Sequence, residues 1–392
     1  MFKNFNPTRK RIISSTTMAA TLFFAAGLFT PFVTPYLLSH GFDKQQISFI
    51  ASLSPLMLII FPPIFGKLSD IVGRRKVISI TLCLLAISRF FYLGVDHNYL
   101  YLVLATMFAY VGFDNAANVI FAKNEDNLSQ RRSLFTGLFE SLKTLGLFLG
   151  IGLGTFIVTT SNIENTLKLS FLIICLLFIY NNLRGSHNHV PLSANGLNPF
   201  RSIRDFWAVK DLRGLGILGI SMHFANAASV IFIPVLTIQT LGADIRYIGY
   251  FALAGSLSHL SQVAFGYSCE LYGSGKTIIR STLLYGSLIS LLFFATSPWF
   301  VVMFGLIGGL ALAAWNTSAV CYMSEIGERL KEEGLVMGSY TSVASMGGFA
   351  GFIASGFLVT LLEVRYLFPI YGVIIVAGVI ISYPYIKASK YY

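Results

Sequence analysis

Charged residues are scarce in this chain of 392 residues, at 11%, whereas hydrophobic residues make up 55%. Soluble domains carry about a quarter charged residues, so this composition and a mean hydropathy of +0.71 exclude a soluble globular protein. A helix needs roughly 20 apolar residues to cross the hydrocarbon layer of a bilayer. The chain contains twelve such segments and little else. The sequence therefore predicts an all-α integral membrane protein.

Cysteine is rare too, and its placement indicates packing rather than chemistry. The four cysteines, Cys83, Cys175, Cys269 and Cys321, lie within or at the ends of apolar segments. They lack the spacing of metal ligands, and we expect neither a metal nor another cofactor. No nucleophile and base pair and no phosphate-binding loop stands out in the sequence. These observations argue against an enzyme.

Acidic residues are outnumbered, since 17 Asp and Glu accompany 28 Lys and Arg, for a formal net charge of +11. A basic chain can indicate nucleic-acid binding, so the distribution of the charges has to be considered. Lys and Arg fall mainly in the two tails and in alternate loops, which is the positive-inside pattern of membrane proteins. We therefore expect a lipid bilayer around the chain, no nucleic acid, and both termini in the cytoplasm.

The apolar segments divide into two sets of six. We place the first six spans at 14–38, 46–66, 77–95, 98–121, 133–158 and 165–183, and the second six at 213–241, 246–268, 277–296, 298–322, 334–361 and 365–386. This predicts an N-terminal six-helix bundle at 1–183, a polar cytoplasmic connector at 184–212 and a C-terminal six-helix bundle at 213–392. The connector ends in an amphipathic segment, Asn198 to Arg213, which we expect on the membrane surface.

One short hairpin stands out between the second and third spans. Residues 66–76 read G-K-L-S-D-I-V-G-R-R-K, with two glycines that permit a sharp turn and a cationic cluster that indicates the cytoplasmic side. This stretch resembles the signature loop of the major facilitator superfamily at Gly66, Asp70, Gly73, Arg74, Arg75 and Lys76. The resemblance implies a twelve-helix transporter with two pseudo-symmetric bundles. It also implies that the loop aspartate locks against the start of the eleventh helix, about Glu333 to Met337.

An internal repeat supports the division into halves. Gly66, Asp70, Gly73 and Lys76 have counterparts 200 positions later at Gly266, Glu270, Gly273 and Lys276. Two further sets match at an offset of 201, namely Gly41, Asp43 and Ile47 with Gly242, Asp244 and Ile248, and Gly137, Ser141, Gly146 and Gly150 with Gly338, Ser342, Gly347 and Gly351. Chance similarity explains any one match between apolar segments, but three matches at nearly one offset indicate a duplication. Substrate is then held between the halves near the midplane, as the resemblance implies.

The fifth span is rich in glycine from Gly146 to Gly154. It resembles the facilitator motif G-x-x-x-G-P-x-x-G of exporting exchangers, except that Ile151 replaces the proline. Glycines at this spacing also let two helices pack closely without any functional meaning. In the fourth span, Phe108 stands where the best-known drug exporters have an arginine, four residues before Gly112. Both departures weaken an assignment to those exporters.

Four charged residues interrupt the apolar spans, and each is costly near the bilayer centre unless it is paired or hydrated. We predict that Asp114, Glu140 and Lys143 form a network across the fourth and fifth spans. One interpretation is a permanent ion pair that fastens two helices. The other is proton coupling, in which one carboxylate exchanges its cationic partner for a proton as the halves move. Arg89 lies nearer the outer face, where snorkelling is one option, and we expect it to act structurally first.

The remaining polar residues of the spans are candidates for hydrogen bonds to a substrate. We predict that Tyr36, Asn115, Asn118, His223, Asn226, Trp315 and Asn316 line the substrate cavity. The competing interpretation for each is helix packing, which is the commoner role of a lone histidine or aromatic residue in a membrane span. Aromatic residues among them provide the apolar wall that small-molecule pockets need.

These observations predict a secondary transporter that moves a small organic molecule across the cytoplasmic membrane by alternating access. We favour proton-coupled efflux, because of the glycine-rich fifth span and the carboxylates inside the spans. A proton symporter that imports a metabolite, a sugar or a siderophore-like chelate is the alternative. A non-transporting membrane receptor is a further alternative. We expect a monomer without cofactors.

Overall fold

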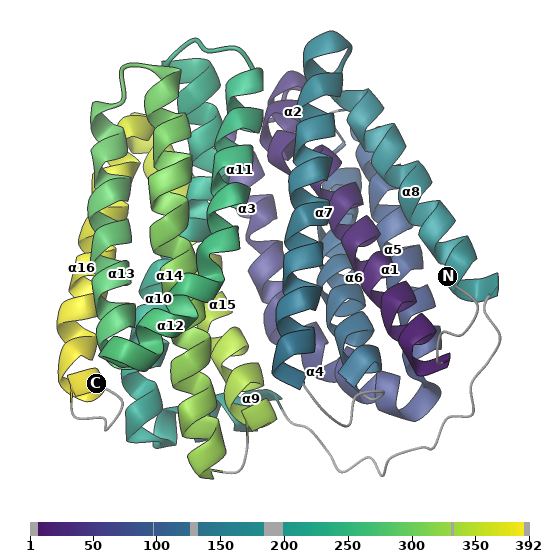
Figure 1. The fold of residues 1–392 in the computed structure, drawn as a ribbon. Coiled ribbons are helices and arrows are strands. Elements are labelled where there is room, and N and C mark those ends of the chain that lie inside the picture. Colours follow the sequence, from purple (N-terminus) through teal and green to yellow (C-terminus); the bar gives the residue numbers. More distant parts are fainter. Residues whose placement is uncertain (1–6, 97, 126–131, 184–198, 331–332, 388–392) are drawn as a thin grey trace. The chain divides into compact units, whose positions relative to one another are not determined.

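The structure is a computed structural model, and it describes residues 7–96, 98–125, 132–183, 199–330 and 333–387. Within these ranges the structure describes the backbone but not the side chains of 7–13, 63, 66, 67, 70, 121–125, 132–138, 199–202, 205, 333–335, 337, 338 and 387. The described part of the chain is almost entirely helical and contains no β-strand (Figure 1). This confirms the predicted all-α class.

Every predicted span coincides with helix. The first half contains α1 (Pro7–Phe29), α2 (Val33–Ser39), α3 (Lys44–Ala51), α4 (Leu53–Val72), α5 (Arg74–Leu93), α6 (Tyr99–Glu125), α7 (Arg132–Thr160) and α8 (Ile163–Leu183). The second half contains α9 (Pro199–Ala208), α10 (Lys210–Val235), α11 (Arg246–Ser258), α12 (Gln262–Tyr272), α13 (Ser274–Leu291), α14 (Pro298–Leu330), α15 (Glu333–Leu361) and α16 (Val364–Lys387). Among the described residues, eleven stretches are long and apolar enough to cross a membrane.

Several spans are interrupted by a turn or a break where one straight helix was predicted. The first passes through a 3₁₀ turn, Thr30–Phe32, because Pro31 has no backbone N–H to continue the α-helical ladder. The seventh ends in a π-helical turn, Leu236–Thr240. The eighth consists of α11, the 3₁₀ turn His259–Ser261 and α12 in direct succession. The eighth span is the predicted one that is absent from the eleven membrane-length stretches of the described residues, although other interrupted spans, such as Ser14–Ser39, are among them.

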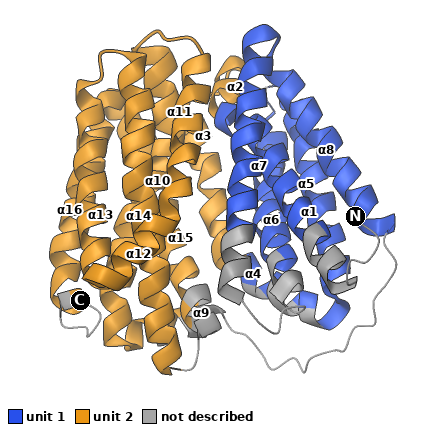
Figure 2. Cartoon of the chain, viewed as in Figure 1, with its two compact units in different colours: residues 1–33, 61–196 blue, residues 34–60, 197–392 orange. Residues whose placement is uncertain are grey.

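The chain forms two compact units by its internal contacts (Figure 2). Unit 1 comprises residues 1–33 and 61–196. Within it, α1 packs on α6, α7 and α8, and α5 packs on α6 and α8. Buried hydroxyls join these helices: Ser170 Oγ donates to the carbonyl oxygen of Ala25 at 2.7 Å, and Ser88 Oγ donates to that of Ala105 at 2.8 Å.

Unit 2 comprises residues 34–60 and 197–392. It repeats the same helix pairs, since α10 packs on α14, α15 and α16, and α13 packs on α14 and α16. Residues 34–60 join this unit through α3, which packs on α15. Ser48 Oγ donates to the carbonyl oxygen of Phe352 at 2.7 Å, and the ring of Phe49 lies 4.9 Å from that of Phe357. The six-helix boundaries at 183 and 213 stay a prediction from the order of the spans.

Glycines permit the closest helix crossing in each unit. On α7, a Cβ atom at Gly150 would lie 2.9 Å from the carbonyl carbon of Phe24 on α1. On α15, a Cβ atom at Gly351 would lie 2.9 Å from the carbonyl carbon of Phe224 on α10. Backbone meets backbone at both places, so any side chain there would push the helices apart. The packing role of these glycines is therefore real.

The backbone also reproduces the repeat that the sequence indicated. Positive φ angles occur at four described glycines, Gly41, Gly73, Gly242 and Gly273, which form two of the predicted repeat pairs. Gly73 has φ 101° and ψ 137°, and Gly273 has φ 88° and ψ 141°. Residues with side chains rarely adopt this region. The two copies of the hairpin therefore share one backbone turn.

Candidate functional site

The signature hairpin joins α4 to α5 at Gly73, and its cations make different contacts. Arg74 Nη1 donates to Ser69 Oγ at 2.5 Å. Arg75 Nε donates to the carbonyl oxygen of Asn181 at 2.8 Å, and its Nη2 donates to that of Asn182. These carbonyls end α8, where a cation also meets the negative end of the helix dipole. Arg75 thus fastens α8, and Lys76 alone of the three is exposed.

The predicted interaction of Asp70 with the start of the eleventh span involves residues that the structure describes only in part. The side chain of Asp70 and the surroundings of Gly66 lie outside the described residues. The helix α15 begins at Glu333, within the range predicted for the start of the eleventh span. The role of the aspartate stays a prediction.

In unit 1, the structure brings charged side chains of α7 together with the aromatic face of α1 and α6. Lys143 Nζ donates to Glu140 Oε1 at 2.7 Å, one turn away on the same helix. The same ammonium lies 4.9 Å from the ring centroid of Phe23, a cation–π contact. Phe23 in turn packs on Phe113 with ring centroids 4.9 Å apart. The Lys143 side chain is 22% exposed and that of Glu140 is 42% exposed, so the ammonium is the less exposed partner of the pair.

Asp114 is placed next to this cluster by the chain, because it follows Phe113 on α6 and the Phe113 ring packs on Phe23. It is partly buried. Within the described part of the chain, Asp114 has neither a hydrogen bond nor an ion pair. A carboxylate away from bulk water is costly unless it is paired or neutralised. The cluster thus holds two carboxylates and one ammonium, and the ammonium is bonded to Glu140.

Arg89, for which a structural role was expected, is enclosed within unit 1 and does not snorkel. Its side chain is only 5% exposed inside unit 1, and the guanidinium carbon lies 5.2 Å from the ring centroid of Phe29. Nε has no hydrogen-bond partner in the described part of the structure. Aromatic rings on α1 and α5 surround it, including Tyr92, which packs on Phe29 at 5.5 Å. Helix packing therefore decides its position.

Three of the predicted cavity residues from the first half lie in different surroundings. Asn115 is buried and donates from Nδ2 to the carbonyl oxygen of Val111 on its own helix at 2.8 Å. Asn118 is exposed. Tyr36 is buried, and its ring contacts that of His40 in a tilted arrangement with ring centroids 4.2 Å apart. Asn115 and Tyr36 therefore make contacts typical of helix packing. Their role at a substrate stays a prediction.

In unit 2, the predicted residues of α10 and α14 do come together. The ring of His223 lies edge-on to that of Trp315 with centroids 5.7 Å apart. Trp315 is 3% exposed, and its indole Nε1 has no hydrogen-bond partner among the described residues. Asn226, one turn after His223, accepts a hydrogen bond at Oδ1 from the hydroxyl of Tyr285 at 3.2 Å. Asn316 is partly exposed.

The two clusters sit at equivalent places in the repeat. Phe24 and Phe224, 200 positions apart, each face the glycine that marks the helix crossing in their own unit. Phe23 and His223 precede them, and each packs on an aromatic residue of the fourth helix of its half. Sequence reasoning found the charges and His223. It missed Phe23, since nothing in the sequence separates this residue from the other 34 of the chain's 35 phenylalanines.

Comparisons with known proteins agree with this geometry. The chain is 24% identical over 374 residues to the quinolone resistance protein NorA of Staphylococcus aureus, with 92% of each chain covered. It is 21% identical to the uncharacterized transporter YwbF of Bacillus subtilis, with 94% of this chain and 92% of that protein covered.

Solved structures share the fold at low identity. The nucleoside transporter NupG superposes with a TM-score of 0.78 at 12% identity, covering 97% of this chain and 100% of that one. The human organic anion transporter MFSD10 superposes with a TM-score of 0.69 at 16% identity, covering 96% and 100%. The sequence model of the Major Facilitator Superfamily matches residues 16–267 and 215–390. The chain is therefore a multi-pass membrane transporter, not an enzyme, and it belongs to the Major Facilitator Superfamily.

Proposed function

We propose that this transporter exports a small organic molecule in exchange for protons, and that Asp114 is the group that carries the proton. The proposed location is the cytoplasmic membrane, with both termini in the cytoplasm and a single chain as the working unit. The proposal rests on one observation, the charge balance of the cluster on α6 and α7.

The cluster holds one cation for two carboxylates. Lys143 is bonded to Glu140 at 2.7 Å, while Asp114 has no bond of its own among the described residues. With both carboxylates ionised the cluster carries one negative charge, and it becomes neutral when one of them takes up a proton. Uptake of that proton at Asp114 leaves the Glu140 pair intact. A charge that one proton can cancel is what proton coupling requires inside a membrane.

Efflux and an organic substrate are supported by relatives rather than by geometry. The 24% identical NorA proteins are described as quinolone resistance proteins, a role that fits export. The glycine crossing between α1 and α7 is the part of this chain that resembles exporting exchangers. Phe23 and Phe113 are in ring contact and only partly buried, so they supply apolar surface for an organic molecule.

A pH gradient across everted membrane vesicles tests coupling and direction together. A fluorescent quinolone serves as the probe, because the relatives point to that class. For one proton exchanged per molecule, an interior one pH unit more acidic drives accumulation up to about tenfold, since one pH unit corresponds to about 1.4 kcal/mol. We expect wild-type vesicles to accumulate the probe and to lose it when a protonophore collapses the gradient.

Asp114→Asn separates coupling from binding. Asparagine resembles the protonated acid in size and lack of charge, so we expect exchange of labelled for unlabelled probe to persist while gradient-driven accumulation disappears. Glu164→Gln is the matched control, because Glu164 forms an exposed ion pair with Lys168 at 3.2 Å. Accumulation by Asp114→Asn at the wild-type level would exclude Asp114 as the coupling group.

The same cluster also suits a proton symporter that imports a metabolite, a sugar or a siderophore-like chelate. That function predicts the opposite movement in the vesicle experiment. An acidic interior would then drive a preloaded probe out of the vesicles instead of concentrating it. Such a result would replace efflux with import and leave the role proposed for Asp114 unchanged.

A further inference from the structure

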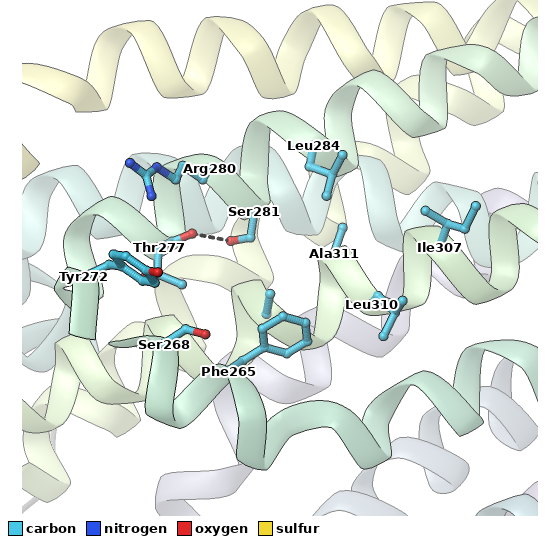
Figure 3. A pocket seen from close by; sticks show the side chains of 11 residues that line it. Phe265, Ser268, Tyr272, Thr277, Arg280, Ser281, Leu284, Ile307, Leu310 and Ala311 are labelled. Atoms are coloured by element: carbon cyan, nitrogen blue, oxygen red, sulfur yellow. Dashed lines mark hydrogen bonds between the residues drawn. The ribbon is translucent and has the colours of Figure 1, made fainter. Parts of the chain in front are cut away.

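A pocket of about 420 Å³ lies in unit 2 between α12, α13 and α14 (Figure 3). Its lining residues recur at helical spacing along each helix, so one face of each contributes. Part of the wall is exposed apolar surface, with Leu284 50% exposed and Ile307 41% exposed. In a membrane protein, apolar side chains exposed at this level face lipid. The pocket therefore opens on the side of the bundle.

The lining changes from polar to apolar along the helices. Figure 3 shows Ser268, Tyr272, Thr277 and Arg280 at one end, and Leu284, Ile307 and Leu310 at the other. The polar end lies near the turn at Gly273, where α12 ends and α13 begins. Arg280 is six residues into α13, about 9 Å along its axis at 1.5 Å per residue. A long cationic side chain at that depth reaches the headgroup boundary.

The serine and threonine hydroxyls at the polar end already have acceptors. Ser281 and Thr277 each donate to a backbone carbonyl of the preceding turn at 2.9 Å, and Ser268 does the same at 3.0 Å. Their hydrogens are therefore not available to a ligand without breaking these bonds. Any strong donor for a ligand has to come from another side chain.

Arg280 provides that donor. Its side chain is exposed, and its guanidinium carbon lies 5.9 Å from the ring centroid of Tyr272. Within the described part of the chain, Arg280 has no hydrogen bond and no ion pair. A guanidinium carries five N–H donors in a planar fork that fits two oxygens of a phosphate or carboxylate at once. The pocket thus presents one unpaired cation at the mouth of an apolar slot.

We propose that this pocket binds an anionic phospholipid of the cytoplasmic leaflet, with its phosphate on Arg280 and the start of an acyl chain against Leu284, Ile307 and Leu310. Positive charge beside apolar surface matches the two parts of such a lipid. A small inorganic anion would satisfy Arg280 but would leave the apolar end uncovered. The positive-inside rule assigns the turn at Gly273 to the cytoplasmic side.

Native mass spectrometry of the detergent-purified protein tests this site without any transport. The probes are phosphatidylglycerol and phosphatidylcholine with identical acyl chains. We expect the wild-type chain to bind phosphatidylglycerol more tightly, and Arg280→Gln to lower that affinity about tenfold, the effect of one charge-assisted contact. Leu284→Trp is expected to lower the binding of both lipids, because the indole fills the apolar end.

Lys276→Gln is the matched control, because it removes one positive charge from the same helix at a residue that does not line the pocket. It should bind phosphatidylglycerol like the wild type. Unchanged binding by Arg280→Gln, or equal binding of the two lipids by the wild type, would overturn the proposal. Displacement of the lipid by millimolar glycerol phosphate would also overturn it, because the site would then recognise the headgroup alone.

Discussion

Replacing Gly150 with alanine tests whether backbone contact between α1 and α7 holds unit 1 together. The new Cβ would lie 2.9 Å from the carbonyl carbon and 3.0 Å from the Cα of Phe24. Carbon atoms pack best at about 3.5–4.0 Å, so the helices would have to separate by roughly 1 Å at this point. No rotamer change relieves the clash, because the neighbouring atoms belong to the backbone of α1.

Two opposing terms set the size of the effect. Alanine favours the helix over glycine by about 1 kcal/mol, while overpacking a tight interior costs about 1–3 kcal/mol. Gly266→Ala measures the helix-propensity term without overpacking, since a Cβ there meets only Thr317 Cγ2 at 4.0 Å. Both variants gain the same helix propensity, so their difference in stability equals the overpacking cost. For a unit of 150–250 residues, 1 kcal/mol corresponds to roughly 2–4 °C in Tm.

Thermal unfolding followed by far-ultraviolet circular dichroism measures this difference, because the described fold is almost entirely helical. We expect Gly150→Ala to melt roughly 2–12 °C below Gly266→Ala in the same detergent, from the energies just given. Gly351→Ala should behave like Gly150→Ala, because its Cβ would meet the backbone of Phe224 in unit 2. A Gly150→Ala protein that melts at or above Gly266→Ala would refute the packing role.

Two further predictions concern side-chain pairs that join helices within unit 2. Arg329 is ion-paired with Asp211 across α14 and α10. Its exposure limits the contribution to under about 1 kcal/mol, so Asp211→Asn should lower Tm only slightly, and exchanging the two residues should restore it. Cys269 Sγ on α12 donates to Ser318 Oγ on α14 at 3.5 Å, and Cys321 lies one turn further along α14. We therefore expect copper phenanthroline to link Cys269 and Cys321, and a non-reduced digest to show the joined peptides by mass spectrometry; Cys321→Ser should abolish that product, and its absence from the oxidised wild type would contradict the expected proximity of the two thiols.

The helical spans could be predicted because a membrane imposes the length and polarity of each segment. The interruptions could not be placed with the same precision. A proline such as Pro31 marks a break, but the 3₁₀ turn at His259–Ser261 contains no proline. The helices on either side of this turn, α11 and α12, both pack on α14, and a long-range contact of this kind is not visible in a local sequence pattern. Local chemistry thus predicts where a helix exists better than where it bends.

The contacts of polar residues depended still more on tertiary structure. The spacing of Glu140 and Lys143 indicated a pair on one helix face, and the structure contains it. Asn115 was equally polar in sequence, yet its side chain returns to a carbonyl of its own helix. Arg89, for which snorkelling was one option, lies against the Phe29 ring inside unit 1. The rotation of each helix about its axis decides which side chains face one another. That rotation depends on the packing of all the helices together, so a local stretch of sequence does not predict it.

The repeat shows how one scaffold can carry different chemistry in its two copies. The crossing glycines are retained in both units, and each faces the backbone of the first helix of its half. At the positions beside those glycines, Glu140 and Lys143 correspond to Thr341 and Ala344, 201 positions later. The second copy therefore keeps the helix packing and lacks the ionisable pair. We infer that proton coupling, if Asp114→Asn abolishes it, has a single location in unit 1, because no carboxylate and ammonium face each other at the equivalent described positions of unit 2.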